Sequence, residues 1–319
     1  MVILLKKLPI PISGLMLGLA ALGNLVGNFS SLFKIVLGNI SALIFILLVL
    51  KIVMFPKAIK EGLNNPVITG IMATFPMSMM LLSTYIKPYS SIFAFSLWIF
   101  GLILISLLII YFTKKYMFKF NIKNVFASYF VLYIGIVVGS VTAPAYNLYN
   151  IGRFIFWYGF IVYLPLIPLV IYRYSIIKEV PEAVKPIIII FAAPASLLLA
   201  GYISSFTEKN LFIIVFLAII ALIMTLYCLL QMPKLLRLKF YPSYSAYTFP
   251  FVISAIAMNM IDNYLVSIGK GISILKYIGN FQILWAIVIV IYVLLGYINY
   301  MIREVRLENK IEAKRIRAN

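Results

Sequence analysis

The sequence predicts an all-α integral membrane protein in which ten transmembrane helices form five parallel helical hairpins. Three observations support this fold class. Hydrophobic residues make up 64% of the 319 residues and charged residues only 11%, and the mean hydropathy is +1.10. The apolar residues form long continuous runs, and these runs recur in pairs along the chain. A soluble fold needs more polar surface than this composition supplies, so a lipid bilayer is the expected environment.

Ten apolar runs are long enough to cross a hydrocarbon core of about 30 Å, which takes roughly 20 helical residues. Their continuous character differs from the alternating segments of about 10 residues in membrane β-barrels. The first run follows Lys6 and Lys7 but no A-x-A cleavage site follows it, so we expect a retained span rather than a signal peptide. The predicted helices cover residues 8–28, 33–55, 65–86, 90–112, 125–146, 150–172, 184–205, 210–231, 243–266 and 277–301.

The distribution of basic residues predicts the orientation, because Lys and Arg accumulate in cytoplasmic loops. With the N-terminus inside, 21 of the 27 basic residues lie on the inner side and six on the outer side. We therefore predict a multi-pass protein of the cell (inner) membrane with both termini in the cytoplasm. This topology accounts for most of the net charge of +19, so no nucleic-acid partner is expected.

The chain divides into a transmembrane domain, residues 1–302, and a basic cytoplasmic tail, residues 303–319. In the tail, Glu304, Glu308 and Glu312 recur among basic residues. This pattern predicts a solvated helix supported by i, i+4 ion pairs.

The odd-numbered helices begin near residues 8, 65, 125, 184 and 243, in steps of 57, 60, 59 and 59 residues. Such a repeat of parallel hairpins can close into a ring. The odd helices are rich in Pro, Gly and hydroxyl residues, whereas the even helices are mostly aliphatic, with Pro165 and Pro168 in the sixth helix as exceptions. Kinked helices are tolerated at membrane depth when they are buried in protein or face a wet cavity. We therefore expect the odd helices to line a central pore and the even helices to face lipid.

A second interpretation of these small residues stays open. Pairs spaced four residues apart, such as Gly14 and Gly18, also allow two helices to pack closely without forming any pore.

The sequence lacks the residues that most enzymes and coupled carriers require. It has no histidine and one cysteine, Cys228, which excludes a Ser-His-Asp triad and His- or Cys-ligated metal sites. None of the eight acidic residues lies in the middle of a predicted span; the nearest, Asp262, is expected to act as a cap or at the membrane interface. Asp-rich motifs, H-E-x-x-H and Gly-rich phosphate loops are absent. We predict no catalytic residues, no cofactor and no metal.

The predicted helix orientation favours anions. All five odd helices begin at the cytoplasmic side, and each helix N-terminus carries roughly +0.5 charge. A cation channel would instead be expected to carry rings of Asp or Glu.

Five segments, one from each odd helix, carry a family resemblance. They are PISGLMLGLAALGNL at 11–25, FPMSMMLLSTYI at 75–86, VLYIGIVVGSVTAP at 131–144, FAAPASLLLAGYI at 191–203 and SYSAYTFPFVISAIAM at 243–258. Together they resemble the tellurite-resistance/dicarboxylate transporter family, which includes a bacterial tellurite-resistance permease and the plant guard-cell slow anion channels. The resemblance implies a ten-helix protomer with quasi-fivefold symmetry, a pore inside the odd helices, and a homotrimer with one pore per protomer.

The resemblance also implies a gate. In that family a phenylalanine on the ninth helix plugs the pore, within an aromatic–Thr/Ser–Phe–Pro context. Tyr247, Thr248, Phe249 and Pro250 match this context, which makes Phe249 the candidate gate. The prolines expected to kink their helices are Pro76, Pro194 and Pro250.

The predicted function is an anion channel or facilitative permease that moves small inorganic or organic anions through a pore gated by Phe249. Small and hydroxyl residues along the route would share hydrogen bonds with a passing anion without holding it tightly. Two alternatives stay open: a proton-coupled mono- or dicarboxylate transporter or tellurite exporter, and a role without ion flux, such as an enzyme or receptor. The predicted lining residues are Ser13, Gly14, Ser78, Thr142, Ser196 and Thr248.

Overall fold

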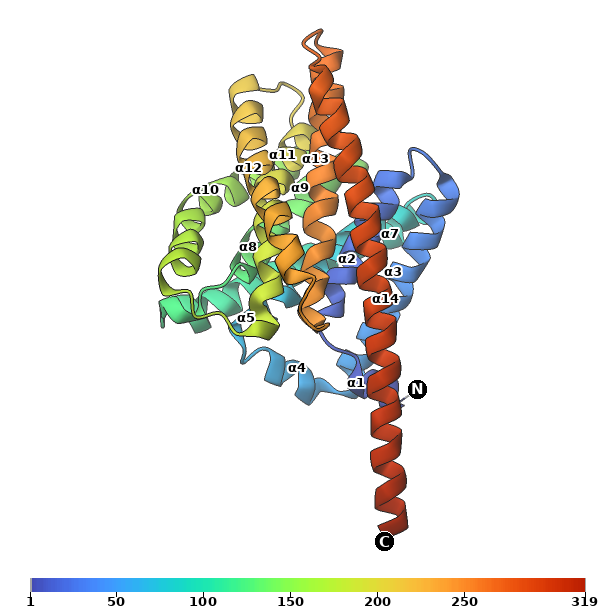
Figure 1. Ribbon diagram of the computed structural model, residues 1–319. Coiled ribbons are helices and arrows are strands. Elements are labelled where there is room, and N and C mark those ends of the chain that lie inside the picture. Colours follow the sequence, from blue (N-terminus) through green and yellow to red (C-terminus); the bar gives the residue numbers. More distant parts are fainter. Residues whose placement is uncertain (1, 319) are drawn as a thin grey trace.

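Helices dominate residues 2–318, the part of the chain that the structure describes, and no strand occurs there. Side chains are described for residues 2–310. Within that part, this computed structural model contains nine helical segments long and apolar enough to cross a membrane, and α2 is a shorter apolar helix of 15 residues (Figure 1). The predicted all-helical fold class is confirmed. The first span is shorter than the predicted range 8–28, because Pro9 and Pro11 separate α2 from a short preceding helix.

Helical segments that alternate along the chain differ strongly in burial. In α2, 14 of the 15 residues are buried, and in the other inner segments 61 to 83% of the most apolar stretch is buried, against 22 to 39% in the outer helices. The inner segments are α2 (Ile12–Val26), α5 with α6 (Pro66–Met72, Thr74–Ile86), α8 to η4 (Ser128–Ile134, η3 Gly135–Val137, α9 Val138–Thr142, η4 Ala143–Tyr146), η6 with α11 (Glu182–Ala192, Ala193–Ser205) and η7 with α13 (Pro242–Tyr247, Thr248–Ser267).

The outer helices carry most of the exposed aliphatic and aromatic side chains, as expected for surfaces that face lipid. They are α3 (Ser31–Met54), α7 (Ser91–Phe112), α10 (Tyr149–Tyr172), α12 (Leu211–Leu235) and α14 (Ser273–Ala318). Short helices precede or connect them: α1 (Val2–Lys7), α4 (Pro56–Gly62), η1 (Thr113–Met117), η2 (Ile122–Asn124) and η5 (Arg173–Ile177).

Four of the five inner segments change helix type or break along their length. The segment from α5 to α6 breaks at Ala73, and η6 and η7 are 3₁₀ helices that pass directly into α11 and α13. Pro76, Pro194 and Pro250 all lie in the first turn of the α-helix that follows such a change. Proline is favourable there, because it has no N–H to donate to a preceding turn.

Each inner segment packs against the next one along the chain, and the last packs against the first. α2 contacts α6, α5 contacts α8, α9 contacts α11, α11 contacts α13, and α13 contacts α2. A Cβ atom at Gly18 would lie only 2.5 Å from Cβ of Thr248, so glycine is required for the close approach of α2 to α13. Close packing, the second interpretation of the small residues, therefore applies at this position.

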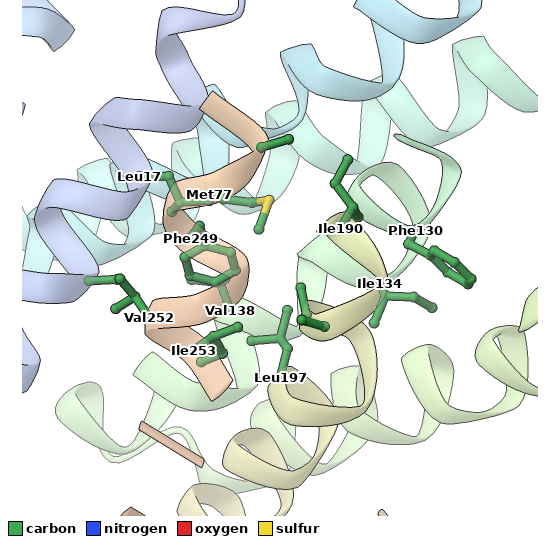
Figure 2. Close-up of a cluster of buried hydrophobic side chains, with 14 of the residues drawn as sticks. Leu17, Met77, Phe130, Ile134, Val138, Ile190, Leu197, Phe249, Val252 and Ile253 are labelled. Carbon is green, nitrogen blue, oxygen red and sulfur yellow. The ribbon is translucent and has the colours of Figure 1, made fainter. Parts of the chain in front are cut away.

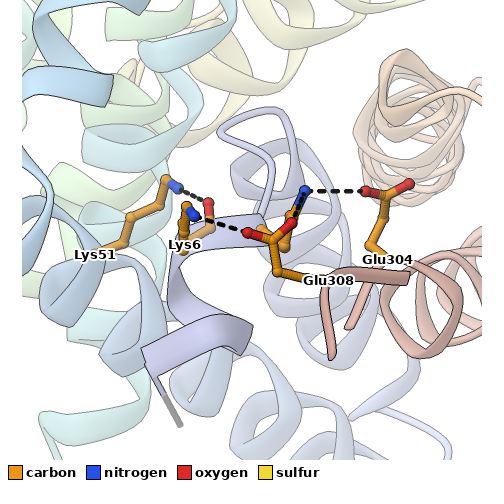
Figure 3. A network of polar contacts seen from close by, with 5 residues as sticks. Lys6, Lys51, Glu304 and Glu308 are labelled. Atoms are coloured by element: carbon orange, nitrogen blue, oxygen red, sulfur yellow. Dashed lines mark hydrogen bonds and ion pairs between the residues drawn. The ribbon is translucent and has the colours of Figure 1, made fainter. Parts of the chain in front are cut away.

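The two termini lie at the same end of the molecule, where α1 packs against the extended α14 (Figure 1). Nζ of Lys6 lies 2.7 Å from Oε1 of Glu308, and Nζ of Lys7 lies 2.9 Å from Oε2 of Glu308 and 3.8 Å from Oε2 of Glu304 (Figure 3). The ion pairs predicted within the tail helix are therefore wrong for these two acids, which pair with α1 instead. Glu312 lies outside the described side chains.

Lys51 of α3 holds α1 in the position in which it forms these ion pairs. Its ammonium group donates to the backbone carbonyl oxygens of Leu5, at 3.1 Å, and Lys6, at 3.0 Å (Figure 3). These contacts satisfy carbonyl groups at the C-terminal end of α1 that have no partner within the helix. The short helix is thus fixed between α3 and α14.

Candidate functional site

A small cavity lies in the middle of the five inner segments, and all five contribute to its wall. The centres of water molecules can occupy a volume of about 40 Å³ in this central cavity, which is enough for a few water molecules. Its wall is almost entirely apolar. The lining residues come from the breaks in the helices or from positions next to them: Gly14, Ile71, Thr74, Met77, Phe130, Val131, Ile134, Gly135, Ile190, Ala193, Pro194, Leu197, Ser245, Ala246, Phe249 and Pro250.

Phe249 is the second residue of α13, directly after the change from η7 to the α-helix. Its side chain is 6% exposed and lines the central cavity. Figure 2 shows the ring within a cluster of buried apolar side chains that come from all five inner segments. One helical turn beyond the cavity, Leu17, Val138 and Ile253 are also buried. We call Phe249 together with these three residues the apolar layer.

The structure brings together four of the residues predicted from the sequence. Phe249, Gly14, Pro194 and Pro250 all line the central cavity, although they lie on three different inner segments. The helix breaks bring these residues, which are distant in the sequence, to the wall of the same cavity.

Pro76 and Ser13 lie elsewhere. They line a separate apolar groove of about 450 Å³ on the outer side of the inner segments, which α3, α6 and α7 enclose. The hydroxyl of Ser13 lies 2.7 Å from the hydroxyl of Thr74, which does line the central cavity.

The remaining predicted hydroxyl residues do not line the central cavity and bond to backbone carbonyl groups. Ser78 donates to the carbonyl of Thr74 at 2.7 Å, Thr142 to that of Val138 at 2.8 Å, and Ser196 to that of Ala192 at 2.8 Å. A hydroxyl has a single proton, so a group that already donates cannot donate to an anion without losing this bond.

Thr248 forms a similar bond between two inner segments. Its hydroxyl lies 2.9 Å from the carbonyl oxygen of Gly14 and 2.7 Å from that of Ser245. This contact stabilises the junction of α2 with the start of α13, next to Phe249.

A second cavity, which we call the outer pocket, lies further along the same segments. It has a volume of about 200 Å³, and its lining residues are Ala21, Asn24, Leu25, Asn28, Leu81, Val141, Ile256, Asn259, Met260 and Asn263. The sequence analysis did not select these four asparagines as site residues. The signal that identifies them is their spacing, because each pair lies four residues apart on an odd-numbered helix.

Comparison with known proteins adds an independent result. A sequence model of a family described as "voltage-dependent anion channel" matches residues 7–298. An uncharacterized transporter of the archaeon Methanocaldococcus jannaschii is 27% identical over 276 residues, which cover 76% of this chain and 77% of the relative.

Proposed function

The chain belongs to the voltage-dependent anion channel family, and from this premise we propose that it is a channel or facilitative permease for small anions. The family resemblance inferred from the odd-numbered helices is thereby confirmed. Members of this family are anion channels or transporters, so the chain belongs to a class of membrane transport proteins. The proposal goes further: anions cross through the centre of the inner segments, and Phe249 controls their passage.

The observation that carries the proposal is the central cavity. All five inner segments contribute to its wall, four of them at or near a break or a change of helix type. Irregular backbone at membrane depth is tolerated where it is buried in protein or lines a cavity. The contacts that run from α2 through each inner segment and back to α2 support a ten-helix arrangement around a pore.

In the proposed closed state the apolar layer blocks the route. Leu17, Val138 and Ile253 are each no more than 2% exposed, and the ring of Phe249 is nearly as buried. A hydrophobic constriction stops ions because water leaves it and the ion would lose its hydration shell. Displacement of the Phe249 ring would widen the constriction from the cavity side.

The charge distribution around the central cavity supports an anion. No Asp or Glu lines its wall, and α6, α11 and α13 begin at its level. The N-terminal end of an α-helix carries a partial positive charge. We propose that the hydroxyl groups of Ser78, Thr142, Ser196 and Thr248 contribute indirectly, by stabilising the backbone near the breaks.

A proton-coupled carrier of mono- or dicarboxylates, or a tellurite exporter, is the second candidate, because the archaeal relative is described as a transporter. The lining of the central cavity contains no ionisable side chain, and proton relays in membranes depend on such groups. Passive transport is therefore the better supported of the two. A homotrimer with one pathway per protomer, both termini in the cytoplasm and a location in the cell membrane complete the proposal.

Reconstitution into liposomes tests the proposed function. Chloride, nitrate, malate and tellurite would be loaded on one side, with and without an imposed pH gradient. A passive pathway equalises anion concentrations and leaves them unchanged when the pH gradient is added. Uphill accumulation driven by the pH gradient would establish the coupled carrier, and absence of any anion flux from correctly folded protein would refute transport.

A further inference from the structure

The outer pocket and the central cavity share three helices, α2, α6 and α13, in their walls. Ala21 follows Gly14 by seven residues on α2, and Ile256 follows Phe249 by seven residues on α13. At 1.5 Å per residue this spacing corresponds to about 10 Å. An ion that leaves the outer pocket towards the other side of the membrane therefore meets the apolar layer next.

The polar surface of the outer pocket comes from four asparagines. Asn24 and Asn28 lie at the end of α2 and just beyond it, and Asn259 and Asn263 lie on α13. Asn259 and Asn263 lie four residues apart and share one face of α13, and α13 packs against α2.

These side chains differ from the asparagines that cap helices. Asn65 and Asn210 cap helices, since their Oδ1 atoms accept hydrogen bonds from Val67 N at 2.9 Å and Phe212 N at 2.8 Å. The four amides of the outer pocket take part in none of the side-chain hydrogen bonds formed within residues 2–310. The four amides therefore have no capping role; Asn28 and Asn263 are exposed, and Asn24 and Asn259 are partly buried.

The charges near the outer pocket favour an anion. Each amide group offers two N–H donors, and no carboxylate lines the pocket. Lys34 lies beside the end of α2, with its ammonium 5.4 Å from the centre of the Tyr85 ring and its Cδ 2.9 Å from where a Cβ atom of Gly27 would lie. Asp262 is adjacent to Asn263 in sequence but is not part of the wall.

We propose that the outer pocket is a receiving site for a small anion, in which asparagine N–H groups replace part of the hydration shell before the anion reaches the apolar layer. This inference rests on the proposed transport function. Neutral donors suit such a role, because a full positive charge in a narrow pocket would hold the anion and slow its release.

The test measures how chloride flux saturates from each side in liposomes, using the Phe249→Ala variant so that the gate does not limit the rate. Asn259→Asp and Asn24→Asp keep the size of the side chain but replace N–H donors by a carboxylate. Each is expected to raise the half-saturating chloride concentration on the pocket side about tenfold or more. The opposite side should change much less.

Asn210→Asp is the matched control. It adds the same charge near the α11–α12 connection, outside the pocket, and Asp caps the start of α12 as well as Asn does. The inference is supported if the half-saturating chloride concentration on the pocket side is unchanged in Asn210→Asp and raised in both pocket variants.

The outcomes separate the two proposals. No chloride flux in folded Phe249→Ala protein refutes the transport function itself. Normal flux with unchanged half-saturation in both pocket variants refutes only the receiving site, and an equal shift in Asn210→Asp would assign the effect to general surface charge. If one pocket variant does not fold, the half-saturating chloride concentration of the other decides the outcome, since Asn24 and Asn259 lie on different helices.

Discussion

Replacement of Phe249 with alanine is expected to raise passive anion flux about 30- to 150-fold. The side chain is 6% exposed, so moving the ring out of its contacts costs nearly the full burial free energy of an aromatic side chain, about 2–3 kcal/mol. A free-energy difference of about 1.4 kcal/mol corresponds to a factor of ten in an equilibrium constant. A pathway that opens by displacing this ring is therefore open only about one-thirtieth to one-hundred-and-fiftieth of the time, and alanine removes that cost.

The assay is single-channel recording of purified protein in planar lipid bilayers with symmetrical chloride, supported by flux measurements in liposomes. Phe251→Ala is the matched control, because Phe251 is 2% exposed and lies two residues along α13. Its ring packs edge-on against Trp285 of α14, with ring centres 5.9 Å apart, and it does not line the central cavity. Both substitutions cost up to about 3–5 kcal/mol of stability, so folding is checked by size-exclusion profile and thermal unfolding.

Two results would refute this reasoning. Wild-type flux in folded Phe249→Ala protein would mean that the ring is not the barrier and that the rest of the apolar layer, Leu17, Val138 and Ile253, closes the route without it. An equal increase in Phe251→Ala would mean that any loosening of α13 opens the pathway, so that Phe249 has no special part.

Three further predictions concern stability. Gly18→Ala should destabilise the protein by about 1–3 kcal/mol, because the new methyl group overlaps Thr248. Unfolding in detergent measures this loss of stability, and an unchanged unfolding midpoint would contradict the close approach of α2 to α13. Thr142→Val should lower stability by about 1 kcal/mol, since the buried Trp98 Nε1 loses its acceptor at 2.7 Å, and a double change with Trp98→Phe should cost less than the sum of the two. Hydrogen bonds from two lysines of α1 lower the pKa of Glu308 from its ordinary 4.5 to about 2, so its stabilising effect should be complete above about pH 4.5 and disappear as pH falls towards 2. Thermal unfolding of Glu308→Gln and wild type across this range should therefore converge at low pH, and a constant difference would contradict the assignment.

Hydropathy was sufficient to predict the helical segments. Their content of Pro, Gly and hydroxyl residues predicted which of them are more buried, because burial in protein and contact with lipid select different residues. Pro, Gly and hydroxyl residues occur where backbone is irregular and packing is tight, and this is where the inner segments are found. A helix was predicted for the tail, and the structure makes it a continuation of α14. The ion pairs of α14 with α1 were not predictable, because the partners lie about 300 residues apart in the sequence.

Prediction of individual lining residues was less successful for a physical reason. Hydroxyl groups in a helix tend to bond to the carbonyl three or four residues earlier, which bends the helix, and Ser78, Thr142 and Ser196 do so to residues four positions earlier. A search for hydroxyls on odd helices therefore finds the residues that stabilise bends near the cavity, while the wall itself consists of apolar residues beside them. The asparagines of the outer pocket escape such a search because their side chains carry amide groups and not hydroxyls.

The proposed pathway combines an apolar barrier at the central cavity with a separate polar site in the outer pocket. Ser78, Thr142, Ser196 and Thr248 donate to backbone carbonyls. In the proposed pathway the barrier at the central cavity is apolar and depends on one movable ring, Phe249. The outer pocket offers donors to a ligand, the side-chain amides of its asparagines, and its wall begins about two helical turns along α13 from that ring. Binding and blocking would thus occur at separate levels, so substitutions at Asn259 should change the concentration dependence of flux, whereas substitutions at Phe249 should change its maximum.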